Sequence, residues 1–187
     1  CMFNHLPKAT QALLWINGGV FLLQLILGSA NFVSFELWPI GDYTAQLGGI
    51  GDVPAGAGFM PWQLLTYGFL HDPSNYRHIF FNMLALLMFG APLEYTWGTQ
   101  RFITYYLVCV VGAGLTYLAW AALLHINAPP IGASGGVFGL LLAYGMLFPN
   151  QLVMLLFPPV RLVAAPVCSG SGVCDCLWGL PSLGGAV

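Results

Sequence analysis

The chain has 187 residues, of which 58% are hydrophobic and only 5% are charged, and its mean hydropathy is +0.81. A soluble globular domain carries about 25% charged residues, so the composition excludes a water-exposed globular protein and indicates an integral membrane protein. The four basic and six acidic residues give a net charge of −2, which argues against nucleic acid as a partner.

Four apolar segments predict transmembrane helices. They cover about residues 12–28, 78–92, 102–124 and 134–148. Some are shorter than the ~20 residues that cross a bilayer, but flanking aromatic residues extend them into the interface. Because backbone groups in lipid must be satisfied internally and the segments do not alternate polar and apolar residues, we expect helices. A weaker fifth segment begins at Leu152 and is interrupted by Pro158-Pro159.

The first segment follows Lys8 without a small-residue cleavage site, so we interpret it as a retained helix. Because the chain starts at Cys1 and not at Met, we expect its natural N-terminus to be absent from this sequence or altered. A cytoplasmic N-terminus places Lys8, Arg101 and Arg161 inside and only Arg77 outside, which the positive-inside rule favours.

Residues 29–76 then form a long external loop that is rich in Gly, Pro, Trp and Phe and poor in charge. A solvated linker would be more polar. We therefore expect the loop to lie in the membrane interface or to pack on the helices, with Phe35, Trp38, Phe59 and Trp62 suited to that position.

The composition changes after Pro159, and from Val167 onward the chain is Gly/Ser/Cys-rich without helical periodicity. This change divides the chain into a transmembrane domain, residues 1–159, and an atypical tail, residues 160–187. Three of the five cysteines lie in the tail, but no further Cys or His follows at metal-ligand spacing. We expect neither a metal nor a cofactor.

Small residues surround Ser134 where the fourth segment begins, in Gly-Ala-Ser-Gly-Gly over residues 132–136. Two interpretations stay open. The serine caps the helix while the glycines let another helix approach, or it is a nucleophile with room for a substrate. Gly135, Gly139 and Ala143 recur every four residues and indicate a close-packing stripe.

His78 and Asn82 are four residues apart, so they share one face of the second helix at its external end. Ser134 begins the fourth helix at the same depth under this topology. Taken singly, Asn82 is expected to form a hydrogen bond between helices. His71, in the preceding loop, is expected to stabilise a turn. Together an imidazole and an amide are donors that an oxyanion hole needs. On the cytoplasmic side, Glu94 and Arg101 indicate a structural turn.

Four motifs in this order and spacing resemble the rhomboid intramembrane serine proteases over roughly residues 62–159: HIFFN, FGAPLE, WGTQRF and GASGGVFGLL. The resemblance implies an all-α membrane protein with a rhomboid-like helical bundle, of whose usual six transmembrane helices about four to five are present. It implies a serine endopeptidase that cleaves transmembrane segments of other proteins in the lipid bilayer. A bacterial inner membrane suits the composition and the lack of extra domains.

The resemblance also implies the roles of single residues. Ser134 corresponds to the nucleophile, and His78, Asn82 and the Ser134 backbone N–H correspond to the oxyanion hole. Phe138 stands where the family has an aromatic residue beside its catalytic histidine, and we group it with Trp62 as substrate-contacting or gating residues. The sequence has Trp62-Gln63 where many members have Trp-Arg.

The family's general base is a histidine on the sixth helix, and the four histidines of this chain are His5, His71, His78 and His125. None follows Ser134, and nothing in the family pattern makes His125 the base. We therefore expect little or no proteolysis from this chain and interpret the tail as truncated or frame-shifted. The alternative is a catalytically inactive rhomboid-like protein that binds transmembrane helices.

Overall fold

The computed structural model describes residues 6–40, 58–124, 129–149, 151–154 and 161–163. The chain forms two compact units, Cys1–Val137 and Phe138–Val187, which are considered separately below. His5, His125, the cysteine-rich tail and its boundary with the transmembrane domain lie outside the described residues.

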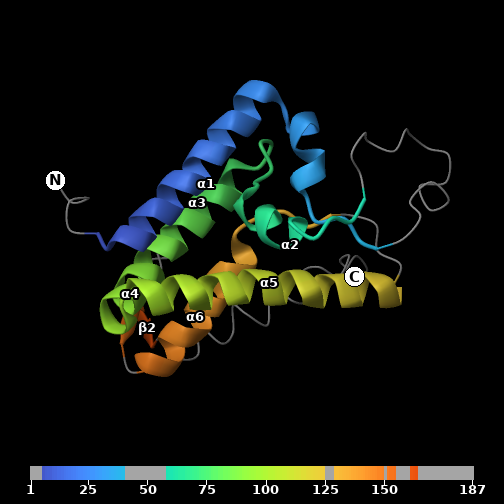
Figure 1. The fold of residues 1–187 in the computed structure, drawn as a ribbon. Helices are drawn as coiled ribbons and strands as arrows, with labels where there is room; N and C mark the ends of the chain where they lie inside the picture. Colours follow the sequence, from blue (N-terminus) through green and yellow to red (C-terminus); the bar gives the residue numbers. More distant parts are fainter. Residues whose placement is uncertain (1–5, 41–57, 125–128, 150, 155–160, 164–187) are drawn as a thin grey trace, which may run out of the picture. The chain divides into compact units, whose positions relative to one another are not determined.

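All four strong apolar segments are helical (Figure 1). The helices are α1 (Lys8–Leu27), a second span made of α3 (Tyr76–Ala85), the π-helical turn η4 (Leu86–Gly90) and α4 (Ala91–Trp97), then α5 (Thr99–Leu124) and α6 (Ser134–Leu147). Among the described residues, three spans are long and apolar enough to cross a membrane, Lys8–Leu27, Tyr76–Trp97 and Thr99–Leu124, and α6 is a shorter apolar helix.

The weak fifth segment does not begin as a helix. Leu152–Met154 is strand β1, which pairs antiparallel with β2 (Arg161–Val163). Residues 152–154 are therefore a strand, and the four strong apolar segments are the ones that form helices. A proline pair in the sequence between the two stretches disfavours a continuous helix, and antiparallel pairing satisfies backbone groups of both strands.

The described parts of the loop between α1 and α3, residues 28–40 and 58–75, pack on the helices, which for these residues is one of the two expected arrangements. Its short elements are η2 (Ser29–Phe35), α2 (Gln63–Thr66) and η3 (Tyr67–Phe69). At Gly114 of α5, a Cβ atom would lie only 3.2–3.3 Å from side chains of Leu37, Leu64 and Tyr67. The close approach of α2 to α5 (Figure 1) thus depends on the absence of a side chain there.

Gln63, which stands where many family members have arginine, is fully buried and organises this loop. Its carbonyl accepts hydrogen bonds from the backbone N–H groups of Trp38 (3.2 Å) and Met60 (3.1 Å). Its amide donates to the carbonyls of Ser34 (3.2 Å) and Gly58 (2.8 Å). A neutral amide therefore meets two donors and two acceptors that a guanidinium, which has only donors, could not satisfy together.

Helix α1 runs alongside the second span (Figure 1) and meets it through buried polar residues. Thr10, Asn17 and Gln24 recur every seven residues on one face of α1 and are 0%, 0% and 2% exposed. At one end of this contact the Glu94 carboxylate is the key acceptor, and at the other Gln24 meets the loop that precedes α3.

The Glu94 cluster consists of Glu94, Ala9, Thr10 and Thr99. The carboxylate accepts from the N–H groups of Ala9 (2.9 Å) and Thr10 (2.7 Å) and from the hydroxyls of Thr10 (2.9 Å) and Thr99 (2.8 Å). It therefore caps the N-terminus of α1, whose first N–H groups have no intrahelical acceptor. Glu94 has the predicted structural role, but through α1 and not through Arg101.

Candidate active site

Ser134 is the first residue of α6, and a tight turn leads into it. The Ala133 carbonyl accepts from the Val137 N–H at 3.0 Å, so helical hydrogen bonding begins directly before the serine. The N–H groups of a first helical turn have no intrahelical acceptor. The Ser134 backbone N–H therefore has no acceptor within α6.

Gly132 brings this turn against His78 of α3. Its φ is +128°, a value that residues with a side chain rarely adopt. A Cβ atom at this position would lie 2.8 Å from Cε1 and 2.9 Å from Nε2 of His78, but 3.8 Å from Nδ1. The Nε2–Cε1 edge of the imidazole thus faces the backbone two residues before Ser134, and only glycine leaves room for it.

Tyr67 fixes the other side of the same turn. Its carbonyl accepts from the Gly132 N–H at 3.1 Å, and its hydroxyl donates to the Val110 carbonyl of α5 at 2.7 Å. The turn before Ser134 is therefore held between η3 and α3, with η3 itself anchored on α5.

Asn82 lies one turn after His78, as their spacing predicts, and is 7% exposed. Its side-chain Nδ2 donates to the His78 carbonyl at 3.0 Å. An amide nitrogen carries two hydrogens, so this intrahelical bond leaves Asn82 a second donor. His78 is half-buried, and together the two residues form one polar face on a largely apolar helix.

The glycines after Ser134 accommodate α5. A Cβ atom on Gly135 would lie 2.6 Å from the Ala113 Cβ, and one on Gly136 would lie 2.5 Å from the Tyr106 ring. The small-residue stripe was expected to let another helix approach closely, and at Gly135 the close neighbour is α5. The role of Gly139 and Ala143 in that stripe stays a prediction.

His71 is a member of the site whose importance the sequence did not reveal. It is 0% exposed, and its backbone N–H donates to Oε1 of Gln24 at 3.0 Å. Its ring stands edge-on to the His78 ring, with centroids 5.6 Å apart and planes at 65°. We expected a histidine that holds a turn, and the only further signal in the sequence was its place seven residues before His78.

Burial, and to a smaller extent the neighbouring His78, lowers the pKa of His71 to about 4. The Phe69 carbonyl opposes this shift, although its geometry falls short of a hydrogen bond. Both ring nitrogens lack a hydrogen-bond partner among the described residues. At neutral pH the His71 imidazole is therefore uncharged, with one donor and one acceptor unused.

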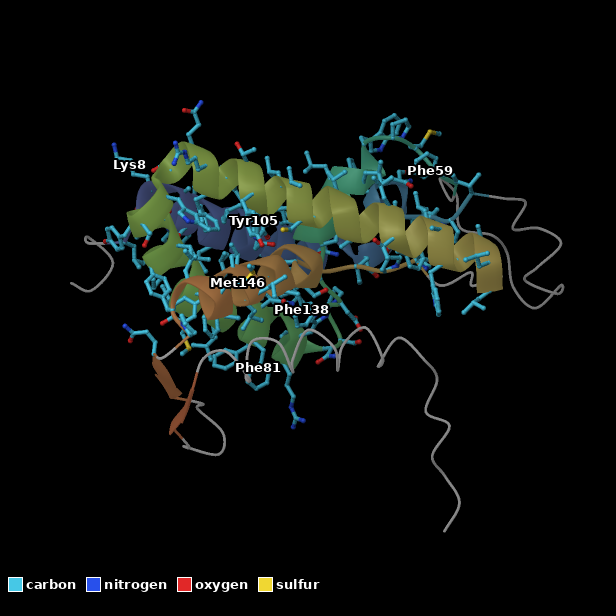
Figure 2. The ribbon with its side chains drawn as sticks, turned by 90° about the horizontal axis from the view of Figure 1, so that it is seen from below. Lys8, Phe59, Phe81, Tyr105, Phe138 and Met146 are labelled. Atoms are coloured by element: carbon cyan, nitrogen blue, oxygen red, sulfur yellow. The ribbon has the colours of Figure 1, made fainter. Side chains whose placement is uncertain are left out.

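The two residues predicted to contact or gate a substrate lie on separate elements. Trp62 directly precedes α2, is 52% exposed, and donates its indole N–H to the Ser34 carbonyl at 3.2 Å. Phe138, labelled in Figure 2, lies on α6 four residues after Ser134, the first residue of that helix. Within the described residues, no group of three or more His, Cys, Asp or Glu side chains is placed to hold a metal ion.

The fold and this site define a class: an all-α integral membrane protein with a serine at a helix N-terminus beside a histidine and an asparagine on a neighbouring span. The sequence model of the Rhomboid domain matches residues 58–182, about two thirds of the chain. The chain belongs to the rhomboid family. The match also extends past Pro159, into the region predicted to be an atypical tail.

Curated relatives agree with this assignment. The chain is 29% identical to Rhomboid protein 1, mitochondrial, of Saccharomyces cerevisiae over 95% of its own length and 52% of the relative. It is 28% identical to Rhomboid-like protease 3 of Toxoplasma gondii, covering 68% and 47%, and 35% identical to Rhomboid-like protein 11, chloroplastic, of Arabidopsis thaliana, covering 54% and 35%. The chain thus spans about half the length of these relatives or less.

Proposed function

We propose that this protein carries the site of an intramembrane serine endopeptidase, with Ser134 as the nucleophile. The Ser134 Oγ attacks a peptide carbonyl in a transmembrane segment of another membrane protein. His78, Asn82 and the Ser134 backbone N–H donate to the oxyanion that forms. The observation that carries the proposal is the packing of the His78 imidazole on Gly132, which brings a donor from α3 to the turn that presents the serine.

The chemistry supports these roles. Donors that are already oriented toward a developing oxyanion stabilise it without reorganising, and one such donor is worth about 10²–10³ in rate. His78 and Asn82 occupy one helical face, and the Ser134 N–H opens α6. Family membership and the protease named among the relatives support the same reaction class.

The sequence of this chain assigns no residue as the general base of the site. A serine hydroxyl is a poor nucleophile until an adjacent base takes its proton, and no histidine follows Ser134 in the sequence. We propose that Ser134 of this chain reacts slowly by itself and that imidazole added to the buffer, which can accept the serine proton, accelerates the reaction.

A fluorophosphonate probe tests the nucleophile directly. The whole chain is reconstituted in lipid nanodiscs and labelled with and without imidazole, and the modified residue is located by peptide mass spectrometry. We expect labelling at Ser134 that imidazole increases and Ser134→Ala abolishes. Ser29→Ala, at an exposed serine of η2, should leave it unchanged. Labelling that persists in Ser134→Ala would contradict the proposal.

A second candidate function is that of an inactive rhomboid-like protein that binds transmembrane helices. A binder needs no reactive serine and no oxyanion donors. Photocrosslinking to a transmembrane peptide, combined with failure of Ser134 to label at any imidazole concentration, would favour this alternative over the protease.

The finer statement of location is also part of the proposal. We place the N-terminus in the cytoplasm and the protein in a bacterial inner membrane, on the distribution of basic residues and on the composition. The relatives named above come from eukaryotes and include a mitochondrial and a chloroplast protein. Reporter fusions after Trp97 and after Pro73 test the orientation, because these positions should lie on opposite sides of the membrane.

A further inference from the structure

Tyr67 makes contacts on both sides of Ser134 in the sequence. Its carbonyl accepts a hydrogen bond from the N–H of Gly132, two residues before the serine, at 3.1 Å. Its hydroxyl lies beside Gly135, the residue after the serine, where a Cβ atom would be only 3.2 Å from the hydroxyl oxygen. The short segment that presents Ser134 is therefore contacted at its start and at its end by one buried residue, which is 5% exposed.

The ring end of Tyr67 is held by α5. Its hydroxyl donates to the Val110 carbonyl at 2.7 Å, the usual length of such a hydrogen bond. The ring has room there because Gly114 lacks a side chain, and a Cβ atom on that glycine would lie 3.2 Å from Cε1 of Tyr67. Burial raises the pKa of Tyr67 to about 12, so the hydroxyl keeps its proton at neutral pH and remains a donor.

The carbonyl end of Tyr67 is held by its own turn. The same oxygen that accepts from Gly132 also accepts from the N–H of Leu70 at 3.2 Å, which closes the 3₁₀ turn η3. A carbonyl oxygen has two lone pairs and can accept both hydrogen bonds. Because both ends of the residue are held, the separation between α5 and the turn before Ser134 is set by the length of one tyrosine.

We propose that Tyr67 is a positioning residue for Ser134, with its hydroxyl bound to α5 and its carbonyl bound to Gly132, so that the turn that presents the serine is fixed. The inference rests on the proposed nucleophilic role of Ser134. Tyr67 takes no part in bond making or proton transfer, and it acts through the backbone of the turn. Since reaction rates depend steeply on the orientation of the nucleophile, loosening this turn slows the reaction of Ser134.

Tyr106 of α5 is the natural comparison, because it also packs on the first turn of α6. It is 0% exposed, and a Cβ atom on Gly136 would lie 2.5 Å from its ring. Its hydroxyl has no hydrogen-bond partner among the described residues. The two tyrosines thus pack against successive glycines, but only the Tyr67 hydroxyl makes a hydrogen bond to a neighbouring helix. Replacing each with phenylalanine separates the hydrogen bond from the packing of the ring.

The rate at which a fluorophosphonate modifies Ser134 in nanodiscs, with imidazole present, is the first readout. Its dependence on probe concentration gives the maximal rate and the apparent affinity separately. In Tyr67→Phe we expect the maximal rate to fall about five- to tenfold, the effect of one lost hydrogen bond, with the affinity unchanged. Tyr67→4-aminophenylalanine, whose amine can donate to the Val110 carbonyl, should recover most of the rate.

Two control variants should label at the wild-type rate. Tyr106→Phe removes a hydroxyl from the other buried tyrosine. Thr99→Val removes a hydrogen bond from the Glu94 cluster and therefore tests whether a loss of stability alone slows labelling. Equal losses of rate in Tyr67→Phe and in either control would show that Tyr67 has only a packing or structural role, and would overturn the proposal.

Hydrogen exchange of the Gly132 amide is a second readout that needs no reaction at Ser134. It is followed by nuclear magnetic resonance of 15N-glycine-labelled protein, in which the signal absent from Gly132→Ala identifies this amide. Exchange should be about five- to tenfold faster in Tyr67→Phe than in the wild type and unchanged in Tyr106→Phe. A Gly132 amide that exchanges freely in the wild type would overturn the proposal, a result that requires no variant to fold.

Together the two readouts separate this inference from the protease proposal. If wild-type Ser134 labels and Tyr67→Phe labels equally fast, the positioning role is wrong and the nucleophile stands. If Ser134 never labels, but Tyr67→Phe accelerates exchange at Gly132 and 4-aminophenylalanine at position 67 reverses this, the protease proposal fails and the anchoring of the turn by Tyr67 stands.

Discussion

The contact between α1 and the second span buries a polar side chain at each end, and the two side chains differ in how many hydrogen bonds they make. At one end the Glu94 carboxylate is 2% exposed and accepts four hydrogen bonds. At the other end the His71 side chain is 0% exposed, and neither ring nitrogen has a partner among the described residues. Both ends tie α1 to the span through a backbone N–H, in one case of α1 and in the other of the loop.

This difference in hydrogen bonding distinguishes the structural Glu94 cluster from the candidate active site beside His71. A buried polar network whose members are all satisfied rigidifies a fold, and an unsatisfied member costs stability. A protein keeps a buried polar group without a hydrogen bond, and the loss of stability that it causes, mainly where function needs that group. The Glu94 end lies far along the span from Ser134, whereas His71 touches the residue that packs on the Ser134 turn.

Glu94→Ala should have the largest effect on stability. It removes the acceptor for two N–H groups and two hydroxyls in a buried position, which should cost about 3–5 kcal/mol. The measurement is the free energy of unfolding in mixed micelles under increasing sodium dodecyl sulfate. Glu36→Ala, at a half-buried loop carboxylate, is the matched control and should cost less than about 1 kcal/mol. Equal losses in the two variants would show that the Glu94 cluster is not a structural clamp.

Gly132→Ala should damage the site more than the fold. The methyl group would meet the His78 ring at 2.8 Å in a backbone conformation with φ of +128°, which should cost about 2 kcal/mol and displace His78. Labelling of Ser134 in the presence of imidazole should fall at least about tenfold. Gly112→Ala is the control, because a Cβ atom there meets nothing within 4 Å. Normal labelling of the Gly132 variant would remove the main support for His78 in the site.

His71 should make stability depend on pH. Its pKa is about 4 in the folded protein and 6.5 in the unfolded chain, so the unfolded state binds more protons between these values. Folding stability should therefore fall as the pH drops from 7 to 5, by about 2 kcal/mol. The other titrating groups contribute to the same curve, so the test is the difference between the wild type and His71→Phe. A slope that His71→Phe leaves unchanged would contradict the buried, neutral imidazole.

Thr99→Val should have the smallest effect. It removes one of four hydrogen bonds to Glu94, from the hydroxyl to Oε1 at 2.8 Å, and leaves the Ala9 N–H on the same oxygen. We expect a loss of about 1 kcal/mol. Thr104→Val, whose hydroxyl donates only within α5 to the Gln100 carbonyl, should change stability by less. A larger loss at position 104 would mean that the cluster is less cooperative than its geometry indicates.

Hydropathy predicted the helices because each span must satisfy its own backbone groups, and their bounds followed within a few residues. The spacing of His78 and Asn82 predicted a shared face for the same local reason. The strand at Leu152–Met154 was missed because a short apolar stretch before a proline pair is compatible with either structure.

Contacts between elements could not be predicted. Nothing in the sequence indicates that Glu94 caps α1, that α5 packs against Gly135, or that His71 is buried beside His78. Each depends on how helices distant in sequence pack side by side, and one sequence carries no record of that. The GASGG motif predicted a special turn, whereas the reason for its first glycine, the His78 ring, emerged only from the structure.

The most direct test of the central claim is the rate at which a fluorophosphonate modifies Ser134 in His78→Ala and Asn82→Ala, measured in nanodiscs with imidazole present. If these side chains are oxyanion donors beside a nucleophilic serine, each variant should remain folded, and its Ser134 should be labelled about 10²–10³-fold more slowly than in the wild type. Wild-type rates in both variants, with Ser134 still the labelled residue, would contradict the account.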